Sequence, residues 1–347
     1  MIRRAPLVWV LTGLAILGAA AVLLSCALGA VSIPVWKQLS IWRETLFEGG
    51  APLEDRAAHL YWNIRLPRVL TAYAAGMGLA AVGALFQALL RNPLAEPYII
   101  GVSPGAALGA TIFIAASAVA SGNSAETGAL AGRAASAFAG ALAAVAAAYL
   151  LASRGRFLNL SDILLAGIAV GSLAAALTSY LWIRVLQQFR GLLYWMMGNL
   201  GSASWKGAAL LACLTIPTAA VCWRLAPALN LMMLGEERAA SLGLNVERFK
   251  RWMLLLGSLT AAGTVAAAGM IGFVGIIAPH IVRRLVGSDN GRAVPASCLF
   301  GGAFLTLCDL VARTAAAPLE LPVGILTAAI GAPFFLTILR QSQAERS

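Results

Sequence analysis

Long apolar runs dominate this sequence of 347 residues and constrain its fold more than any other feature. A membrane-spanning helix needs about 20 mostly apolar residues, so these runs predict about ten crossings. The runs lie at residues 7–31, 64–90, 98–119, 128–151, 161–186, 205–225, 251–272, 274–286, 293–312 and 321–339. The run at 273–286 is too short for a full crossing and is expected to be a partial one. Residues 187–204 are expected to form a short helix or turn outside the membrane core.

The composition favours an all-α polytopic membrane protein with a single transmembrane domain over residues 1–347. Hydrophobic residues make up 60% of the chain and charged residues 11%, whereas soluble domains carry about a quarter charged residues. The first run is longer than the roughly 7–15 residues of a signal-peptide core, which predicts an uncleaved first helix. A weak resemblance of Leu23–Cys26 to a lipoprotein cleavage site is outweighed by the many later runs.

The basic residues indicate membrane topology rather than a nucleic-acid-binding surface. The formal net charge is +11, but Lys and Arg are scattered and lie mostly between apolar runs. With the N-terminus in the cytoplasm, the majority of them fall on the inner side, as the positive-inside rule requires. We therefore expect both termini in the cytoplasm.

The sequence lacks the residue patterns of nucleotide, metal and cofactor sites. None of its three lysines has the glycine-rich setting of a phosphate-binding loop, so any ATP hydrolysis must take place on another chain. His59 and His280 fall on opposite predicted sides, which argues against a shared metal or haem site. The five cysteines lie in apolar runs without metal-ligand spacing, and we expect them to be buried small hydrophobic residues.

Two other functional classes fit less well. An ion-coupled secondary transporter would place acidic side chains at mid-membrane, but Glu96, Asp162, Asp309 and Glu320 fall near predicted span ends. A membrane enzyme would need a His/Asp or Ser/His pair at mid-span, which the sequence does not offer. The chain is therefore expected to be a transport subunit rather than an enzyme.

Small residues predict where helices pack closely. Gly101, Gly105 and Gly109 recur at every fourth position and would form a smooth stripe on one helix face. Such stripes let two backbones approach each other in lipid. We expect this packing to occur within the chain rather than in a dimer.

Two proline-containing segments interrupt the apolar pattern. The first reads Arg91-Asn92-Pro93-Leu94-Ala95-Glu96-Pro97-Tyr98, and its prolines prevent helix continuation. Such a segment is a loop at the membrane interface or lines an aqueous cavity. The second, Gly272–Arg284, contains Pro279, where the helix is expected to break.

The largest polar interruption on the predicted inner side lies at about residues 227–249. Its centre, Leu234–Asn245, has acidic residues near its start, small residues in the middle and a glycine near its end. This pattern predicts a short helix. Its small side chains would allow close docking of another protein.

These three segments resemble those of the FecCD-type permeases, which are type II ABC importer permeases for iron chelates, haem and vitamin B12. The resemblance extends from about Arg65 to Leu339. It implies a helical bundle in the bacterial inner membrane that pairs with a second copy of itself. It further implies two cytoplasmic ATPase subunits, which hold ATP and Mg²⁺, and a periplasmic substrate-binding protein.

The resemblance also implies three sets of functional residues. The ATPase would contact a coupling loop at Gly235, Glu236, Glu237, Ala239, Ala240, Ser241 and Gly243. The binding protein would dock on Arg65, Arg68 and Arg313. A cytoplasmic gate would form at Asn92, Leu94, Leu160 and Ser161, where apolar side chains could exclude water.

Simpler interpretations of the same residues remain open. Arg65 and Arg68 could anchor the helix at the membrane interface, and Arg313 could pair with Asp309 at i,i+4. The gate residues could merely end helices.

The expected substrate is an iron chelate, either a siderophore or haem, which passes from the binding protein to the cytoplasm by alternating access. A cobalamin importer is the alternative within the family. An ion-coupled secondary transporter is the alternative outside it.

Overall fold

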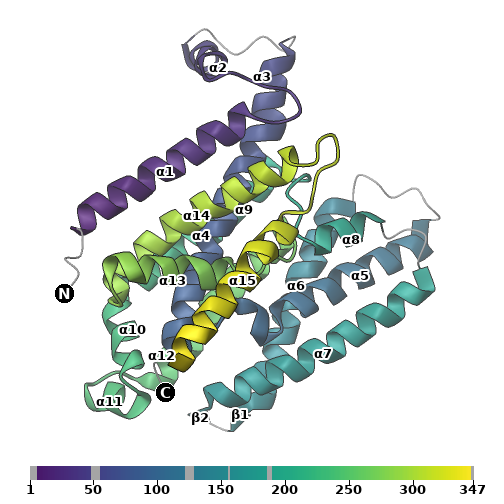
Figure 1. Cartoon of the computed structure of the whole chain (residues 1–347). Helices are drawn as coiled ribbons and strands as arrows, with labels where there is room; N and C mark the ends of the chain where they lie inside the picture. Colours follow the sequence, from purple (N-terminus) through teal and green to yellow (C-terminus); the bar gives the residue numbers. More distant parts are fainter. Residues whose placement is uncertain (1–5, 48–54, 122–128, 155–156, 186–189, 345–347) are drawn as a thin grey trace.

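The computed structural model describes residues 6–47, 55–121, 129–154, 157–185 and 190–344, which form a helical bundle (Figure 1). The helices are α1 (Leu7–Ala27), α2 (Val35–Phe47), α3 (Arg56–Leu60), α4 (Leu66–Leu89), α5 (Val102–Ser121), α6 (Ala129–Ala152), α7 (Leu160–Val185), α8 (Arg190–Met196), α9 (Trp205–Arg224), α10 (Ala226–Met233), α11 (Glu236–Ser241), α12 (Val246–Ala268), α13 (Val274–Val286), α14 (Asn290–Thr314) and α15 (Val323–Ala344). A π-helical turn, η1 (Tyr61–Arg65), joins α3 to α4, and a 3₁₀ turn, η2 (Pro97–Ile100), precedes α5. The strands β1 (Ser153–Arg154) and β2 (Phe157–Leu158) pair antiparallel between α6 and α7.

Among the described residues, seven helical segments are long and apolar enough to cross a membrane. They are α1, the continuous segment from α3 to α4, α6, α7, α9, α12 and α14. The helices α5 and α15 contain shorter apolar stretches, and α13, with 13 residues, is the partial crossing expected at 273–286. Each predicted apolar run therefore coincides with a helix, which confirms the all-α membrane class.

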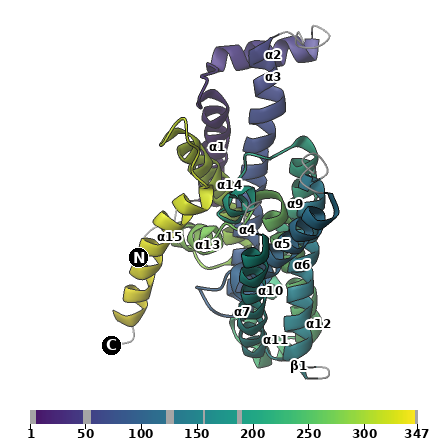
Figure 2. The ribbon, with the colours of Figure 1, turned by 90° about the vertical axis from the view of Figure 1, so that its right-hand side faces the viewer.

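The two ends of the bundle carry different short elements. Figure 2 shows α2 and α3 at one end and α11 and β1 at the other. We call these ends the α2 face (residues 28–47, 55–65, 197–204 and 315–322) and the α11 face (residues 90–95, 153–154, 157–159, 225–250 and 287–292). On the α2 face, the ring of Trp62 lies 4.8 Å from Trp42 and 6.2 Å from Trp205, centroid to centroid. Aromatic side chains gather in this way at membrane–water interfaces.

Helix α4 is the centre of the bundle, and nearly all of its side chains are buried. Its neighbours approach it closely at glycines: a Cβ atom on Gly76 would overlap the carbonyl group of Gly301 in α14, and one on Gly83 would overlap that of Gly275 in α13. Association in lipid depends on such close van der Waals packing because the apolar solvent removes the hydrophobic driving force.

The predicted glycine stripe holds α5 against α6. Gly105 and Gly109 face the backbone of Ser136 and Gly140 in α6, as expected for packing within the chain. Gly101 differs, since it precedes α5 with a φ of +87° and lies against Gly167 of α7. The left-handed conformation ends the η2 turn, which a residue with a side chain would do only with strain.

Several boundaries depart from the apolar runs. Helix α12 begins at Val246, five residues before the run at 251–272, and its charged first turn explains why apolar content missed it. Pro279 does not break its helix as predicted: α13 continues from Val274 through it to Val286. The interruption lies earlier, where Gly269 and Phe273 have φ values of +75° and +68°.

The glycine contacts generate a stability prediction. Gly83→Ala should lower the free energy of unfolding by about 1–3 kcal/mol, the usual cost of overpacking, because the methyl group meets the backbone of α13. Gly13→Ala on the exposed side of α1 is the matched control, since a Cβ there has no neighbour within 4 Å. Reversible unfolding in SDS–detergent mixtures measures both, and equal stability of the two variants would contradict the prediction.

Candidate functional site

Two short helices form the protruding part of the α11 face. Helix α10 ends at Met233, and α11 follows after Gly235, whose φ of +113° permits the sharp change of direction. Glu236 and Glu237 occupy the first turn of α11, where negative charge is favourable. Gly243, with a φ of +90°, ends the segment. The predicted short helix with an acidic start and a glycine stop is therefore confirmed.

The predicted coupling residues divide by exposure. Glu237, Ala240, Ser241 and Gly243 are exposed, and Gly235 and Glu236 are partly exposed. Ala239 is fully buried and packs in the apolar cluster beneath α11. Its expected place on the docking surface is thus corrected: Ala239 anchors α11 to the bundle, because the helix must bury one side to stay in place.

A groove of about 490 Å³ runs beside α11. Its lining combines bases and acids from two segments, namely Arg91, Leu234, Gly235, Glu236, Glu237 and Arg238. Arg91 reaches it from the end of α4 and has a φ of +49°, an uncommon conformation for a residue with a side chain. The proline-containing loop and the coupling segment, far apart in sequence, therefore form one surface.

The two predicted gate segments are ordered by asparagine turns. The side-chain oxygen of Asn92 accepts a hydrogen bond from the N–H of Leu94 at 2.9 Å. That of Asn159 accepts one from the N–H of Ser161 at 3.0 Å. Leu94 is partly exposed and Ser161 is exposed.

Leu160 does not share this exposure. It is 8% exposed and belongs to the apolar cluster that also contains Ala95 and Ile163. Leu160 was expected to line a constriction of the pathway together with Leu94, but its side chain is buried in the bundle instead. Since Leu160 opens α7, its burial instead anchors the start of that helix.

Glu96 contacts the start of α13. Its carboxylate accepts a hydrogen bond from the N–H of Phe273 at 3.1 Å, at the start of α13. Glu96 directly follows residues 90–95 of the α11 face and precedes η2, so it lies in the connection between α4 and α5. Glu96 therefore lies near the ends of two helices, as expected. A negative charge here stabilises the N-terminus of a helix that begins inside the bundle.

The start of α13 is also bound to α4. The side-chain amide of Gln87 donates to the carbonyl of Gly275 at 3.0 Å, and the guanidinium of Arg283 donates to the side-chain oxygen of Gln87. A cavity of about 10 Å³, room for about one water molecule, lies beside Glu96 and Tyr98. No sequence pattern predicts this arrangement, since a phenylalanine has no preference for the left-handed conformation of Phe273.

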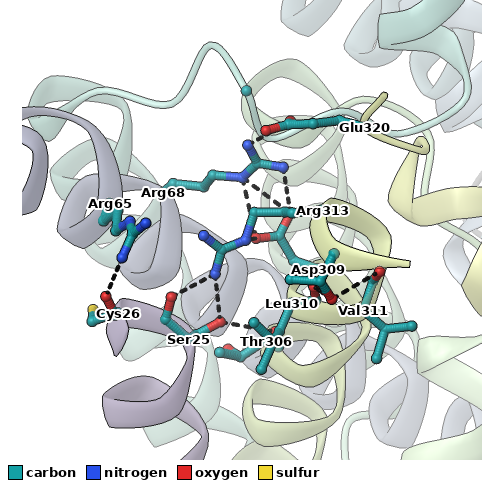
Figure 3. A network of polar contacts seen from close by, with 12 residues as sticks. Ser25, Cys26, Arg65, Arg68, Thr306, Asp309, Leu310, Val311, Arg313 and Glu320 are labelled. Atoms are coloured by element: carbon teal, nitrogen blue, oxygen red, sulfur yellow. Dashed lines mark hydrogen bonds and ion pairs between the residues drawn. The ribbon is translucent and has the colours of Figure 1, made fainter. Parts of the chain in front are cut away.

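Near the α2 face, an ion-pair network joins α4 to α14 (Figure 3). The Nε–H group of Arg68 donates to both carboxylate oxygens of Asp309 at 3.1 Å. The Nη2 group of Arg68 donates to Asp309 Oδ1 at 2.9 Å. Arg68 also binds Glu320 at 2.7 Å. Arg313 completes the network, with its Nε atom 3.3 Å from Asp309 Oδ2.

The same network reaches the end of α1. Arg313 donates to the carbonyl oxygen of Ser25 at 2.6 Å and to its hydroxyl at 3.0 Å. Arg65 donates to the carbonyl oxygens of Cys26, at 2.8 Å, Ala27 and Val31. Cationic groups are favourable at a helix C-terminus, where carbonyl groups lack helical partners.

The three arginines expected to dock a partner are therefore not surface residues in this conformation. Arg65, Arg68 and Arg313 are 4%, 8% and 7% exposed, and their partners lie within the chain. The i,i+4 pair with Asp309 that was the alternative for Arg313 is present. The premise of exposed arginines is corrected, while docking of a binding protein at this face stays a prediction.

The histidines and cysteines form no common site among the described residues. His59 lies 3.0 Å from the amide of Asn63, whereas the ring of His280 packs edge-on against Phe334. No group of three or more His, Cys, Asp or Glu side chains within these ranges could hold a metal ion. Four cysteines are buried as expected, but Cys213 is exposed on α9.

Comparison with known proteins gives consistent matches over nearly the whole chain. The model of the FecCD transport family matches residues 16–341. The cobalamin import system permease protein BtuC of Halobacterium salinarum is 39% identical over 308 residues, which cover 89% of this chain and 80% of the relative. The hemin transport system permease protein HmuU of Yersinia pestis is 38% identical over 84% of this chain and 86% of its own. A solved inward-facing structure of a metal-chelate type ABC transporter superposes with a TM-score of 0.80 at 29% identity, covering 95% of this chain and 98% of that chain.

The ion-pair network generates a second prediction. Asp309→Asn leaves Arg313 buried without a charged partner and Arg68 with only the half-exposed Glu320, and breaking a buried pair in this way costs about 3–5 kcal/mol. Glu320→Gln removes a partner of the same Arg68, but the Glu320 side chain is 52% exposed, so its loss should cost about 0–1 kcal/mol. Unfolding free energies in detergent distinguish the two variants, and comparable losses would show that the network does not stabilise the fold through Asp309.

Proposed function

The chain belongs to the FecCD transport family, and from this premise we propose that it is the permease of an ATP-driven importer for an iron chelate, a siderophore or haem. Members of this family are membrane permease subunits of ABC importers and are not themselves enzymes. In the proposed complex, two copies of the chain surround the transport pathway. The complex lies in the bacterial inner membrane. Two ATPase subunits, which hold ATP and Mg²⁺, bind to it from the cytoplasm, and a binding protein delivers the chelate from the periplasm.

The observation that carries the proposal is the pair of short helices on the α11 face. Helix α11 protrudes beside a groove of about 490 Å³ and is anchored by the buried Ala239. Its exposed side offers Glu237, Ala240 and Ser241 to a partner. An anchored, protruding helix can be displaced as a unit by a second protein, which is the requirement for transmitting work from a separate ATPase.

The remaining parts of the proposal follow from the two faces. We place the α11 face and both termini in the cytoplasm and the α2 face outside, where the binding protein docks. Arg65, Arg68 and Arg313 then support that docking surface from beneath it. Asn92, Leu94, Leu160 and Ser161 belong to the two segments that close the pathway at the cytoplasmic end, with Leu94 and Ser161 offering the accessible side chains.

The docking of the ATPase can be tested on the exposed side of α11. Glu237→Lys combined with Ala240→Trp adds bulk and reverses a charge without entering the core, so the permease should insert and fold but lose the ATPase on co-purification. Ala19→Trp adds the same bulk on the exposed side of α1 and should retain it. An ATPase that stays bound to the α11 variant with unchanged activity would overturn this assignment.

The substrate class has two candidates within the family. An iron chelate is supported by the similarity to the hemin permease and to the metal-chelate transporter. A corrinoid is supported by the similarity to the cobalamin permease, whose identity of 39% differs little from the 38% of the hemin permease. These similarities describe a shared architecture, and the binding protein supplies the discrimination in the proposed system.

Uptake into liposomes that contain the complete complex identifies the substrate. We expect ATP-dependent uptake of haemin or of a ferric hydroxamate siderophore, and none of cyanocobalamin, when the cognate binding protein is supplied. Uptake of cyanocobalamin alone would replace the iron chelate by the corrinoid. Uptake that persists without ATP and collapses with an uncoupler would support an ion-coupled transporter instead.

A further inference from the structure

A buried lysine lies behind the coupling helix. Lys250 is in the first turns of α12 and is 1% exposed, which is rare for this residue type unless its charge is paired. Its ammonium group contacts three oxygens: Glu236 Oε2 at 2.8 Å, Glu247 Oε1 at 2.6 Å and the carbonyl oxygen of Leu158 at 2.6 Å. An ammonium group has three donors, and these three contacts use all of them.

Two hydrogen bonds of Leu158 hold β2 against α12. Leu158, in β2, donates its N–H to Glu247 Oε2 at 2.9 Å while its carbonyl oxygen accepts from Lys250. The N–H and the carbonyl oxygen of Leu158 are thus both bound by side chains of α12, from Glu247 and Lys250, which lie three positions apart. Strand β2 cannot shift relative to α12 without breaking these two hydrogen bonds to charged side chains, which are stronger than neutral ones.

Leu158 leads directly into α7. The next residue, Asn159, caps the helix by accepting from the N–H of Ser161 and, through its carbonyl oxygen at 3.2 Å, from that of Ile163. Leu158, Leu160 and Ile163 are all buried in the cluster that contains Ala239 of α11. The position of Leu158 therefore determines the position of Ser161.

The contact of Lys250 with Glu236 joins β2 and α12 to α11. Glu236 is the first residue of α11 and lies at the edge of the groove, with its side chain 34% exposed. We propose that Lys250 is a positioning residue that ties α11 to the segment before α7, so that a displacement of α11 moves Ser161. This inference rests on the proposed function, because it assigns the path by which the ATPase acts on the gate.

The charge balance explains why a lysine is required at this position. Glu236 and Glu247 both face the same buried point, and without a cation between them they would repel each other. A hydrophobic residue would also leave the carbonyl oxygen of Leu158 without its donor. Lys250→Met is therefore a severe change that risks misfolding, whereas Glu236→Gln replaces the ion pair with α11 by at most a weaker neutral hydrogen bond and leaves Glu247 and Leu158 bound to Lys250.

The test uses the full permease with its ATPase in liposomes, with native cysteines replaced and Ser161→Cys introduced. Labelling of this cysteine by a polar maleimide is measured without nucleotide and with ATP and vanadate. The parent should show a nucleotide-dependent labelling rate, and Glu236→Gln should reduce that dependence by about fivefold or more, the lower end of coupling between linked sites. Glu237→Gln removes the neighbouring carboxylate of α11, which is not among the contacts of Lys250, and should keep the nucleotide dependence of the parent in complexes with bound ATPase.

Assembly is checked in parallel, so that each outcome has one meaning. The ATPase is supplied in excess and its co-purification is measured for each variant, because Glu236 is itself a predicted ATPase contact. Lys250→Met, where it folds, should lose the nucleotide dependence as well. An unaltered dependence in Glu236→Gln overturns the inference while leaving ATP-driven import intact. A parent complex that binds the ATPase and imports haemin, yet labels Ser161→Cys independently of nucleotide, also overturns it without affecting the proposed function.

Discussion

The contact of α4 with its neighbours at glycines is the interaction on which the rest of the structure depends. In lipid, helices gain little from burying apolar side chains against each other, so they associate where backbones can come close. Gly76 and Gly83 allow α14 and α13 to touch α4 directly. This closeness brings Arg68 within reach of Asp309 near one end of α4 and Gln87 within reach of Gly275 near the other. The polar contacts are thus consequences of backbone packing.

An unpaired charge is costly away from water, which favours ion pairs inside the bundle. The network of Arg68, Asp309 and Arg313 and the contacts of Lys250 follow this rule at opposite faces. The first joins long helices to one another and resists change. The second joins a short exposed helix to a segment that precedes a long one, and this difference in placement gives the two networks different roles.

Sequence reasoning succeeded for the site where it concerned backbone geometry and failed where it concerned side-chain direction. The acidic start and glycine end of α11 follow from local chemistry, and both were predictable. Burial of Ala239, Leu160 and the three arginines was not, because alanine, leucine and arginine occur on either side of a helix near a membrane interface. Which side faces inward depends on neighbours that are distant in sequence, such as α14 for Arg68.

The sequence by itself determined the membrane class, the positions of the crossing helices and the interruption at the first proline-containing segment, because apolar length and the prolines that end a helix act locally. Its motifs also identified the family. Only the tertiary structure decided that Arg91 and α11 share one groove, that Glu96 meets the start of α13, and that Lys250 links three segments. These contacts join residues 14 to 177 positions apart, and no local pattern encodes which distant partner a buried polar group will meet once the helices have packed.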